Sequence, residues 1–394
     1  MQAFDLDNRP SGERLGITAA AARIGREVAA PHADDVDRRA RFPEEALSAL
    51  RHERLLSAYV PAELGGLGCS IGQLCTATET LARHCASTGM IFAMHQIQVA
   101  CLVHHGASAW FRDYLQSLCR EQLLLASVTS EVGVGGDLRR SIAHVDGTGT
   151  LTVRKSAPTA SYVEHADALL LTARRSAEAA PADQVLVLLR RDQLELERTG
   201  TWDALGMRGT CSPSYEVFAR FGAEQLLHDF ACIASHTMVP FSHLLWASCW
   251  LGVAVDAVAK ARRYVRGEAR KKPGVVPPGA LRLAEASTLL ELMRARVLSA
   301  QTEHSALLAS EDVGDMLSSV GYAIRINELK LAASELVVEI VTRALRICGM
   351  AAYKNDSALS LGRQLRDAHS AALMIGNDRI CASNAALLLV HKDD

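Results

Sequence analysis

The stretch LTVRKSA, residues 151–157, decides the fold class because it lies inside a chain that is otherwise helical in character. It belongs to a set of short β-rich runs separated by Gly, Asp and Pro residues. The other runs are ALLLTAR (168–174), QVLVLLR (184–190) and SYEVFARF (214–221). We therefore predict a β domain over residues 123–233.

Helical patterns flank this β domain on both sides. Residues 1–122 are rich in Ala, Leu, Glu and Arg, with apolar residues three and four apart, as in FPEEALSALRHERLL (42–56). A turn at Pro61 and the glycines of 65–68 divides them into two groups of helices. Residues 234–394 contain long runs that predict an antiparallel bundle: 241–270, 278–310, 313–348 and 377–390. The predicted class is mainly α with a central β domain.

The composition argues against two classes of partner. A chain of 394 residues with 49% hydrophobic and 22% charged residues is ordinary for a globular protein of two or three domains. A net charge of -2 provides no basic field for nucleic acid or an anionic membrane. The most apolar run, LLWASCWLGVAV (244–255), is shorter than the roughly 20 residues of a membrane span, so we expect a buried helix.

Cysteine usage and the N-terminus predict a cytoplasmic protein. The 10 cysteines form no C-x-x-C pair, and residues 1–16 contain early acidic residues and no apolar core segment. This pattern favours reduced thiols and neither a secretory signal nor a transit peptide. The adjacent His104 and His105 suggest a metal, but further ligands are not apparent, and a solvated helix end is the alternative. We predict no metal site.

Several segments, in the same order along the chain, resemble the acyl-CoA dehydrogenase superfamily of flavoproteins. They are VPAELGGLGCS (60–70), SEVGVGGD (130–137), WDALGMRGTCS (202–212), CGMAAY (348–353) and LRDAH (365–369). The resemblance implies an N-terminal helical domain, a middle β-barrel or sandwich, and a C-terminal four-helix bundle. It also implies FAD as cofactor, held in a homodimer or homotetramer.

The same resemblance names residues for the cofactor. Ser130 matches the position whose hydroxyl and amide meet the pyrimidine end of the flavin, and Thr159 matches a threonine near the flavin N5. Gly135, Gly349 and Asn377 complete the expected set, with the Gly349 segment near the flavin of the neighbouring subunit. Without the resemblance, Ser130 and Thr159 would be ordinary strand and turn hydroxyls.

Two departures from the family pattern concern the cofactor. Ala157 stands where the family has a tryptophan, so a packing partner of the flavin is lost and space is gained. RGEARKKPG (266–274) replaces an Arg-x-x-Phe-Gly segment that holds the cofactor diphosphate across the dimer. Arg270, Lys271 and Lys272 keep the positive charge for this task, or they form a solvated helix end.

A third departure removes the usual base. The loop reads MIGN (374–377) where the family has Tyr-Glu-Gly-Thr, so Ile375 replaces the glutamate that takes the substrate proton. Ser242 or His243 matches the place where some relatives carry this glutamate instead, and Asp378 follows the loop. Each candidate has a structural alternative: His243 as a buried core histidine, and Asp378 in the acidic first turn of a helix capped by Asn377.

Three functions follow from these features. The leading prediction is a flavin-dependent oxidoreductase that acts on an acyl thioester of coenzyme A or a carrier protein, with a non-standard base and an electron-transfer partner or oxygen. The second is a flavin-dependent monooxygenase, which needs no carboxylate in the loop. His95 lies where some such enzymes place a histidine near the ring. The third is a non-catalytic scaffold that keeps the fold.

Overall fold

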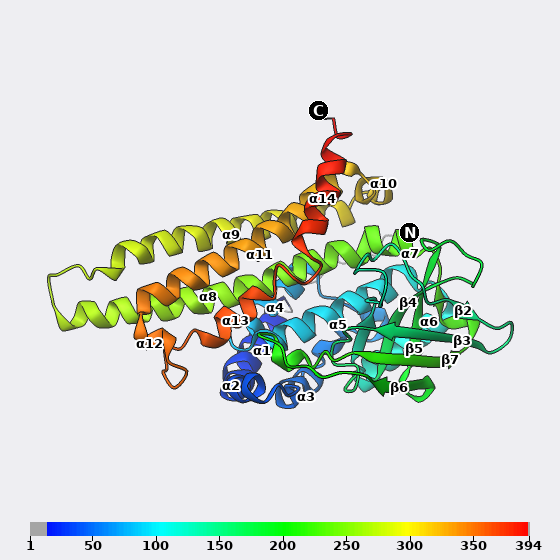
Figure 1. Ribbon diagram of the computed structural model, residues 1–394, viewed down its shortest axis with the longest axis horizontal. Helices are drawn as coiled ribbons and strands as arrows, with labels where there is room; N and C mark the ends of the chain where they lie inside the picture. Colours follow the sequence, from blue (N-terminus) through cyan, green and yellow to red (C-terminus); the bar gives the residue numbers. More distant parts are fainter. Residues whose placement is uncertain (1–13, 393–394) are drawn as a thin grey trace.

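The computed structural model describes residues 14–392. Figure 1 shows two helical parts that pack directly against each other, with a small β part at one side. The prediction about a targeting segment concerns residues 1–16, nearly all of which lie outside the described residues. Within the described residues the order is helices, strands, then helices, so the fold class expected from the sequence is confirmed.

The first helical part packs around a central buried helix, α5 (Ala86–His105). Apolar spacing in this sequence places nearly every residue of α5 in contact with protein rather than solvent. The other helices are α1 (Arg14–Arg23), the π-helical η1 (Ile24–Ala29), α2 (Ala30–Arg39), α3 (Glu44–His52), α4 (Ile71–Ala82) and α6 (Ala109–Glu121). The 3-10 segments are η2 (Leu55–Ser57) and η3 (Ala62–Leu64).

Glycines make the predicted turn between these two groups of helices. Gly65 and Gly68 have φ angles of +90° and +55°, in the left-handed region that favours glycine. Gly66 has a negative φ, but a Cβ there would lie 2.0 Å from the carbonyl oxygen of Val60. The turn is therefore closed to larger residues for two different reasons.

The β part consists of two four-stranded sheets, as expected for a barrel or sandwich. The first sheet has the order β1 (Leu125–Val128), β4 (Ala168–Arg174), β5 (Gln184–Arg190), β8 (Leu226–Leu227). The second has the order β2 (Val145–Asp146), β3 (Leu151–Ala157), β7 (Tyr215–Phe221), β6 (Leu194–Arg198). The predicted runs are β3, β4, β5 and β7. Short 3-10 segments η4 (Arg191–Gln193), η5 (Arg208–Thr210) and η6 (Ala223–Gln225) occupy the connections.

Burial explains why some of the four predicted runs are continuously apolar while others alternate apolar and polar residues. Strands β4 and β5 pair antiparallel in register from Ala168 with Arg190 to Arg174 with Gln184, and their apolar residues are buried on both faces. Strand β3 alternates buried and less buried residues because only one of its faces packs against the core. It pairs with β7 along its whole length.

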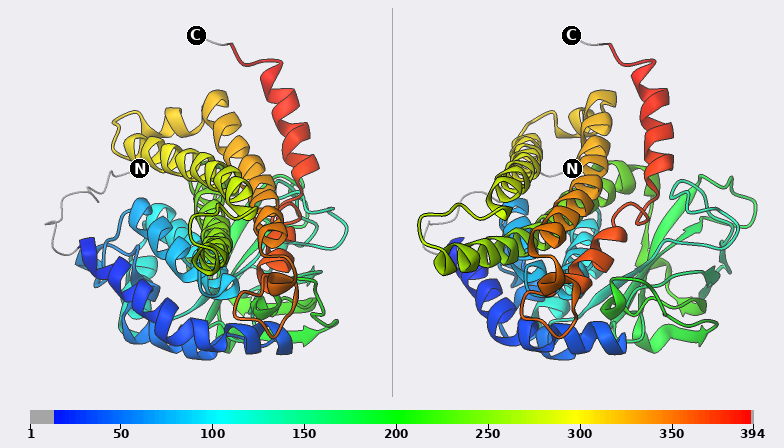
Figure 2. Two further views of the ribbon diagram at one scale, coloured as in Figure 1. Left: turned by 90° about the vertical axis from the view of Figure 1, so that its left-hand side faces the viewer. Right: turned by 60° about the vertical axis from the view of Figure 1, so that its left-hand side comes forward.

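The last part is a bundle built on three long helices that lie side by side in Figure 1. These are α8 (Val239–Lys271), α9 (Gly279–Leu308) and α11 (Val320–Cys348). The shorter elements are α7 (Phe230–Ile233), η7 (Ala234–Met238), α10 (Val313–Leu317), α12 (Met350–Tyr353), α13 (Gly362–His369) and α14 (Asn377–Leu388). Figure 2 shows α14 projecting from the bundle.

One detail of the helical prediction was wrong. The run 313–348 is not one helix: it breaks after α10, and the hydroxyl of Ser319 accepts a hydrogen bond from the Tyr322 N–H to begin α11. The apolar run 244–255 lies within α8, which matches the predicted run 241–270, and it is largely buried as predicted. The stretches Ala86–His105 and Phe230–Lys271 are long and apolar enough to cross a membrane, but their most apolar windows are 94% and 83% buried inside the protein. Burial accounts for their composition.

Candidate functional site

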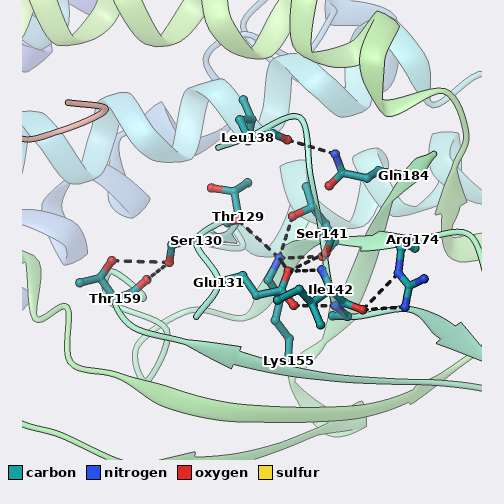
Figure 3. Close-up of polar contacts among 12 residues, drawn as sticks. Thr129, Ser130, Glu131, Leu138, Ser141, Ile142, Lys155, Thr159, Arg174 and Gln184 are labelled. Atoms are coloured by element: carbon teal, nitrogen blue, oxygen red, sulfur yellow. Dashed lines mark hydrogen bonds and ion pairs between the residues drawn. The ribbon is translucent and has the colours of Figure 1, made fainter. Parts of the chain in front are cut away.

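The hydroxyl of Ser130 lies against the backbone of Thr159, so the loops that follow β1 and β3 meet (Figure 3). Ser130 Oγ donates a hydrogen bond of 2.5 Å to the Thr159 carbonyl, and Thr159 Oγ1 lies 3.5 Å from Ser130 Oγ. Both residues are at least partly exposed. The structure therefore brings together the two hydroxyls that the sequence predicted to contact a flavin, and we call the Ser130–Thr159 pair the rim. The role of the rim toward a cofactor stays a prediction.

Glu131 and Lys155 hold this loop from below (Figure 3). The Glu131 carboxylate is buried and accepts hydrogen bonds from Ser141 Oγ at 2.6 Å and from the N–H of Ala143 at 2.5 Å. Lys155 Nζ lies 3.6 Å from Glu131 Oε2 and donates to the Thr172 carbonyl at 2.7 Å. Burial lowers the pKa of Lys155 to about 8, and the Glu131 charge opposes this shift. The 130–137 loop thus begins from a fixed anchor.

The middle of the 130–137 loop is made of glycines with left-handed backbone. Gly133, Gly135 and Gly136 have φ angles of +90°, +61° and +77°. Arg379, in the first turn of α14, donates a hydrogen bond to the Gly135 carbonyl. A Cβ built on Gly135 would meet nothing within 4 Å, so the loop faces open space at this point.

The turn that carries Ile375 is held by Lys330 of α11. Lys330 Nζ donates to the Ile375 carbonyl at 2.7 Å and to Asn377 Oδ1 at 2.6 Å. Asn377 Nδ2 in turn donates to Ser334 Oγ at 3.1 Å. The prediction that Asn377 caps the last helix was wrong: Gly376 is the N-cap, and the Asn377 side chain is used by Lys330 and Ser334 instead.

The three candidate bases lie in different places. Ser242 is buried, and its Oγ donates to the carbonyl of Met238 at 2.6 Å, the last residue of η7. His243 is 2% exposed, and its Nδ1 is 3.0 Å from the carbonyl of Ile326, so Nδ1 carries the proton. Burial lowers the pKa of His243 to about 4, which keeps the ring neutral. Asp378 is exposed in the first turn of α14.

The ring of His95 is fully used in hydrogen bonds to the backbone. It is fully buried, its Nε2 lies 2.6 Å from the Leu56 carbonyl, and its Nδ1 accepts the N–H of Leu125 at 3.0 Å. With Nδ1 as acceptor, Nε2 must carry the proton and donate it to Leu56. His95 therefore connects the first helical part to β1, with no ring nitrogen left for another ligand.

His104 and His105 end α5, as the alternative to a metal site predicted, and they are partly exposed with their rings hydrogen-bonded to neighbouring side chains. His104 is half-buried with Nε2 2.7 Å from Tyr59 OH, and the half-buried His105 has Nε2 2.9 Å from Thr237 Oγ1. Among residues 14–392 no group of three or more His, Cys, Asp or Glu side chains is arranged to hold a metal ion. The ten cysteines, which all lie within residues 14–392, form no disulfide.

Two predicted cofactor elements lie away from the 130–137 loop within one chain. Gly349 ends α11 at the end of the bundle far from the strands, and the 270–272 segment ends α8 at the same far side (Figure 1). Lys271 binds Glu268 at 2.7 Å, and Arg270 and Lys272 are exposed. These groups are open to solvent and do not join the Ser130 rim of their own chain.

The residues of the rim fit the edge of a flavin. Such a ring needs hydroxyl and N–H groups at its polar edge and room beside its faces. Ser130 and Thr159 supply accessible hydroxyls, and Gly135 leaves open space where any side chain would fill it. Ala157 is buried at the end of β3, so no large side chain from this position covers the rim.

Sequence reasoning missed the two buried lysines, and each left a signal. In β3, Lys155 has the same parity as Leu151 and Val153, so it points to the buried face of the sheet. In α11, Lys330 falls four residues after Ile326 and seven before Val337, on the apolar stripe. A lysine at an apolar position of an otherwise regular pattern is the feature that would have identified both.

Two family models match most of the helical sequence. Residues 11–122 match the acyl-CoA dehydrogenase N-terminal domain, and residues 235–386 match the acyl-CoA dehydrogenase C-terminal domain. The chain belongs to the acyl-CoA dehydrogenase family. This confirms the resemblance seen in the sequence.

The relatives of this acyl-CoA dehydrogenase family member include proteins named as dehydrogenases and one named as a nitrososynthase. Probable acyl-CoA dehydrogenase fadE25 of Mycobacterium leprae is 36% identical over 146 residues, a match that spans 36% of this chain and only 37% of that protein. Cyclohexane-1-carbonyl-CoA dehydrogenase of Geobacter metallireducens is 26% identical over 92% of this chain and 94% of its own length. L-evernosamine nitrososynthase of a Micromonospora strain is 28% identical over 89% of this chain and 83% of its own length.

Solved structures share the fold along the whole chain. Butyryl-CoA dehydrogenase from Megasphaera elsdenii superimposes with a TM-score of 0.80 at 20% identity, covering 97% of this chain and 100% of that chain. FMN-bound TdsC from Paenibacillus superimposes with a TM-score of 0.81 at 22% identity, covering 97% and 98%. At these identities the similarity establishes only the fold of this family member.

Proposed function

We propose that this chain is a flavin-dependent oxidoreductase that works without a carboxylate at position 375. The observation that carries the proposal is that the chain has accessible hydroxyls at Ser130 and Thr159 but an aliphatic side chain, that of Ile375, where the family has its base. Ser130 and Thr159 offer polar groups to a ring edge, whereas Ile375 offers no atom that can accept a proton.

The cofactor would be held at one edge by Ser130 and Thr159 and would lie beside Gly135. When bound, a flavin would supply two-electron chemistry, either by accepting hydride from a substrate carbon or, after an external electron donor has reduced it, by giving two electrons to oxygen so that one oxygen atom enters the substrate and the other leaves as water. FAD is our proposed form, with FMN as the alternative, since one structure of the same fold is described as FMN-bound. Analysis of the flavin released by heat distinguishes the two.

Oxygenation is the first candidate reaction. It requires no carboxylate in the turn, and two of the three predicted substitutes for the missing base are unsuitable: Ser242 and His243 are buried and already bonded to backbone carbonyls. A neutral imidazole with its pKa near 4 and its Nδ1–H committed to Ile326 leaves only a buried Nε2. The nitrososynthase relative, aligned over 89% of this chain, adds support.

Dehydrogenation of an acyl thioester, on coenzyme A or a carrier protein, is the second candidate. The similarity to fadE25 and to cyclohexane-1-carbonyl-CoA dehydrogenase favours it. Asp378 is the one predicted base with an exposed side chain, and its carboxylate would accept the substrate proton. Electrons would then pass to a partner protein or to oxygen.

One experiment separates the two candidates. The flavin-loaded protein is mixed, without oxygen, with a panel of acyl-CoA thioesters while the yellow absorbance is followed. Oxygenation predicts that the absorbance stays and that the chemically reduced protein then consumes oxygen. Bleaching by a thioester, abolished in Asp378→Asn but not in Asp315→Asn, would support dehydrogenation. Failure to bind flavin would overturn both candidates and favour the scaffold.

A homodimer or homotetramer in the cytoplasm completes the proposal. Gly349 and the basic residues 270–272 lie far from the rim of their own chain, where they would be available to a second copy. Ten cysteines without a disulfide among residues 14–392 suit a reducing compartment. Light scattering on the flavin-loaded protein measures the assembly, and a monomeric mass would contradict it.

A further inference from the structure

Lys330 is a buried amine with no carboxylate within ion-pair distance among residues 14–392. Its side chain is 0% exposed. Besides the Ile375 carbonyl and Asn377 Oδ1, the interaction found for Nζ is with the Trp250 ring, whose centroid is 5.9 Å away. An amine that gives up its hydration without a counter-ion must be compensated by the groups it binds. The 375–377 turn therefore supplies the hydrogen bonds that compensate for the burial of the Lys330 amine.

The backbone of this turn is strained at the residue that Lys330 binds. Ile375 has a φ of +51°, in the left-handed region, where a β-branched side chain is disfavoured. Such a conformation persists only when surrounding contacts hold it. The hydrogen bond from Lys330 Nζ reaches the carbonyl of Ile375 itself, whose direction depends on that backbone conformation.

Contacts continue from the turn to the 130–137 loop. Asn377 is bound by Lys330 and Ser334 and is the first residue of α14. Arg379 follows two residues later and donates to the Gly135 carbonyl. A Cβ on Gly136 would lie 3.0 Å from the Arg379 guanidinium, which shows how closely the two segments pack.

We propose that Lys330 is a positioning residue for this rim. It holds Ile375 in the left-handed conformation and, through Asn377 and Arg379, fixes the 130–137 loop that carries Ser130. The part of this inference that concerns the cofactor rests on the proposed flavin function. The hydrogen bonds from Lys330 to Ile375 and Asn377, which we call the clamp, belong to the chain itself and can be tested without flavin.

Hydrogen exchange in the flavin-free protein tests the clamp. The amides of Asn377, Arg379 and Ile380 are hydrogen-bonded within this turn and the start of α14. Lys330→Met removes a charge-assisted donor from two buried acceptors, so exchange at these amides should become about tenfold faster or more. Lys260→Met is the matched control, since Lys260 Nζ also binds a backbone carbonyl, that of Ser360, at 2.9 Å. Unchanged exchange in Lys330→Met would overturn the clamp.

A second substitution tests the role of backbone strain. Glycine adopts positive φ without penalty, so Ile375→Gly in the Lys330→Met background should restore most of the lost protection. Further loss in the double variant would show that Lys330 does not act through the conformation of Ile375. If Lys330→Met does not fold, Asn377→Ala replaces it, because it removes one of the two acceptors and should loosen the same amides.

Flavin titration tests the connection to the rim. Lys330→Met should bind flavin about tenfold more weakly, Lys330→Arg should recover part of the affinity, and Lys260→Met should match the unmodified protein. Equal affinity in Lys330→Met, together with faster exchange, would overturn the connection while the clamp stands. If the unmodified protein binds no flavin, the proposed function fails, and the exchange result alone decides the clamp.

Discussion

Lys155 Nζ lies 3.6 Å from Glu131 Oε2 in a buried ion pair directly beneath the loop that carries Ser130. The pair joins β3 to the start of the 130–137 loop. Because the carboxylate also accepts hydrogen bonds from Ser141 and the backbone, the loop cannot move without exposing or unpairing a buried charge.

Removing one partner of this ion pair should strongly destabilise the protein. Glu131→Ala leaves the buried Lys155 amine without its carboxylate partner, so we expect a loss of about 3–5 kcal/mol in the free energy of unfolding. Urea titration measures it. The matched control is Glu195→Ala, whose exposed partner is Arg220, and it should change little. Equal effects from the two substitutions would show that Glu131 is not an anchor.

Ser130→Ala should weaken flavin binding without changing stability. The hydroxyl lies at an accessible rim, so its loss removes a hydrogen bond to the cofactor, worth about tenfold in affinity, and leaves the core intact. Fluorescence titration measures the affinity. Ser214→Ala is the control, because Ser214 also accepts a hydrogen bond from a threonine hydroxyl, that of Thr199, in the same β part. A similar loss in both variants would contradict the rim.

Acid should destabilise the protein through its buried histidines. Burial lowers the pKa values of His95, His104, His105 and His243 to about 4 and that of His304 to about 3, against 6.5 for the free side chain. The unfolded chain therefore binds more protons between pH 6.5 and 4, and stability falls as the pH is lowered through that window. Urea midpoints measured across this range test the prediction. In His243→Gln the loss should be smaller by up to about 3 kcal/mol.

Asp367 should act in the opposite direction over the same pH range. It is 3% exposed, its Oδ1 accepts the Met207 N–H at 2.7 Å, and burial raises its pKa to about 6 from 3.8, with Arg363 opposing the shift. The folded state therefore binds more protons between pH 3.8 and 6, so this contribution is present below that window and is lost as the pH rises. The stability difference between wild type and Asp367→Asn should fall by up to about 3 kcal/mol from pH 4 to 6. A constant difference would contradict it, and exposed Asp192→Asn is the control.

The sequence predicted the strands well because their local pattern agrees with their packing. The runs 151–157, 168–174 and 184–190 coincide with β3, β4 and β5, since buried strands need continuous or alternating apolar residues. The break between α10 and α11 was missed because apolar spacing continues on both sides of it. A single capping hydroxyl at Ser319 decides the break, and its effect depends on the tertiary path of the chain.

For the site, the sequence identified which residues meet but not what supports them. Ser130 and Thr159 were found through a family pattern, and they do lie together. Neither the burial of His243 nor the use of Asn377 by Lys330 could be read from spacing, because both depend on how α8, α11 and α14 pack. Buried polar partners are a property of tertiary structure, so they are the part that local patterns convey least.

The most direct measurement compares wild type with Ile375→Glu, each loaded with flavin and mixed with acyl-CoA thioesters in the absence of oxygen. Our account holds that the rim binds flavin and that position 375 lacks the base. It therefore predicts that wild type stays yellow while Ile375→Glu is bleached by at least one thioester. Full bleaching of wild type, at a rate that Ile375→Glu does not exceed, would contradict the account.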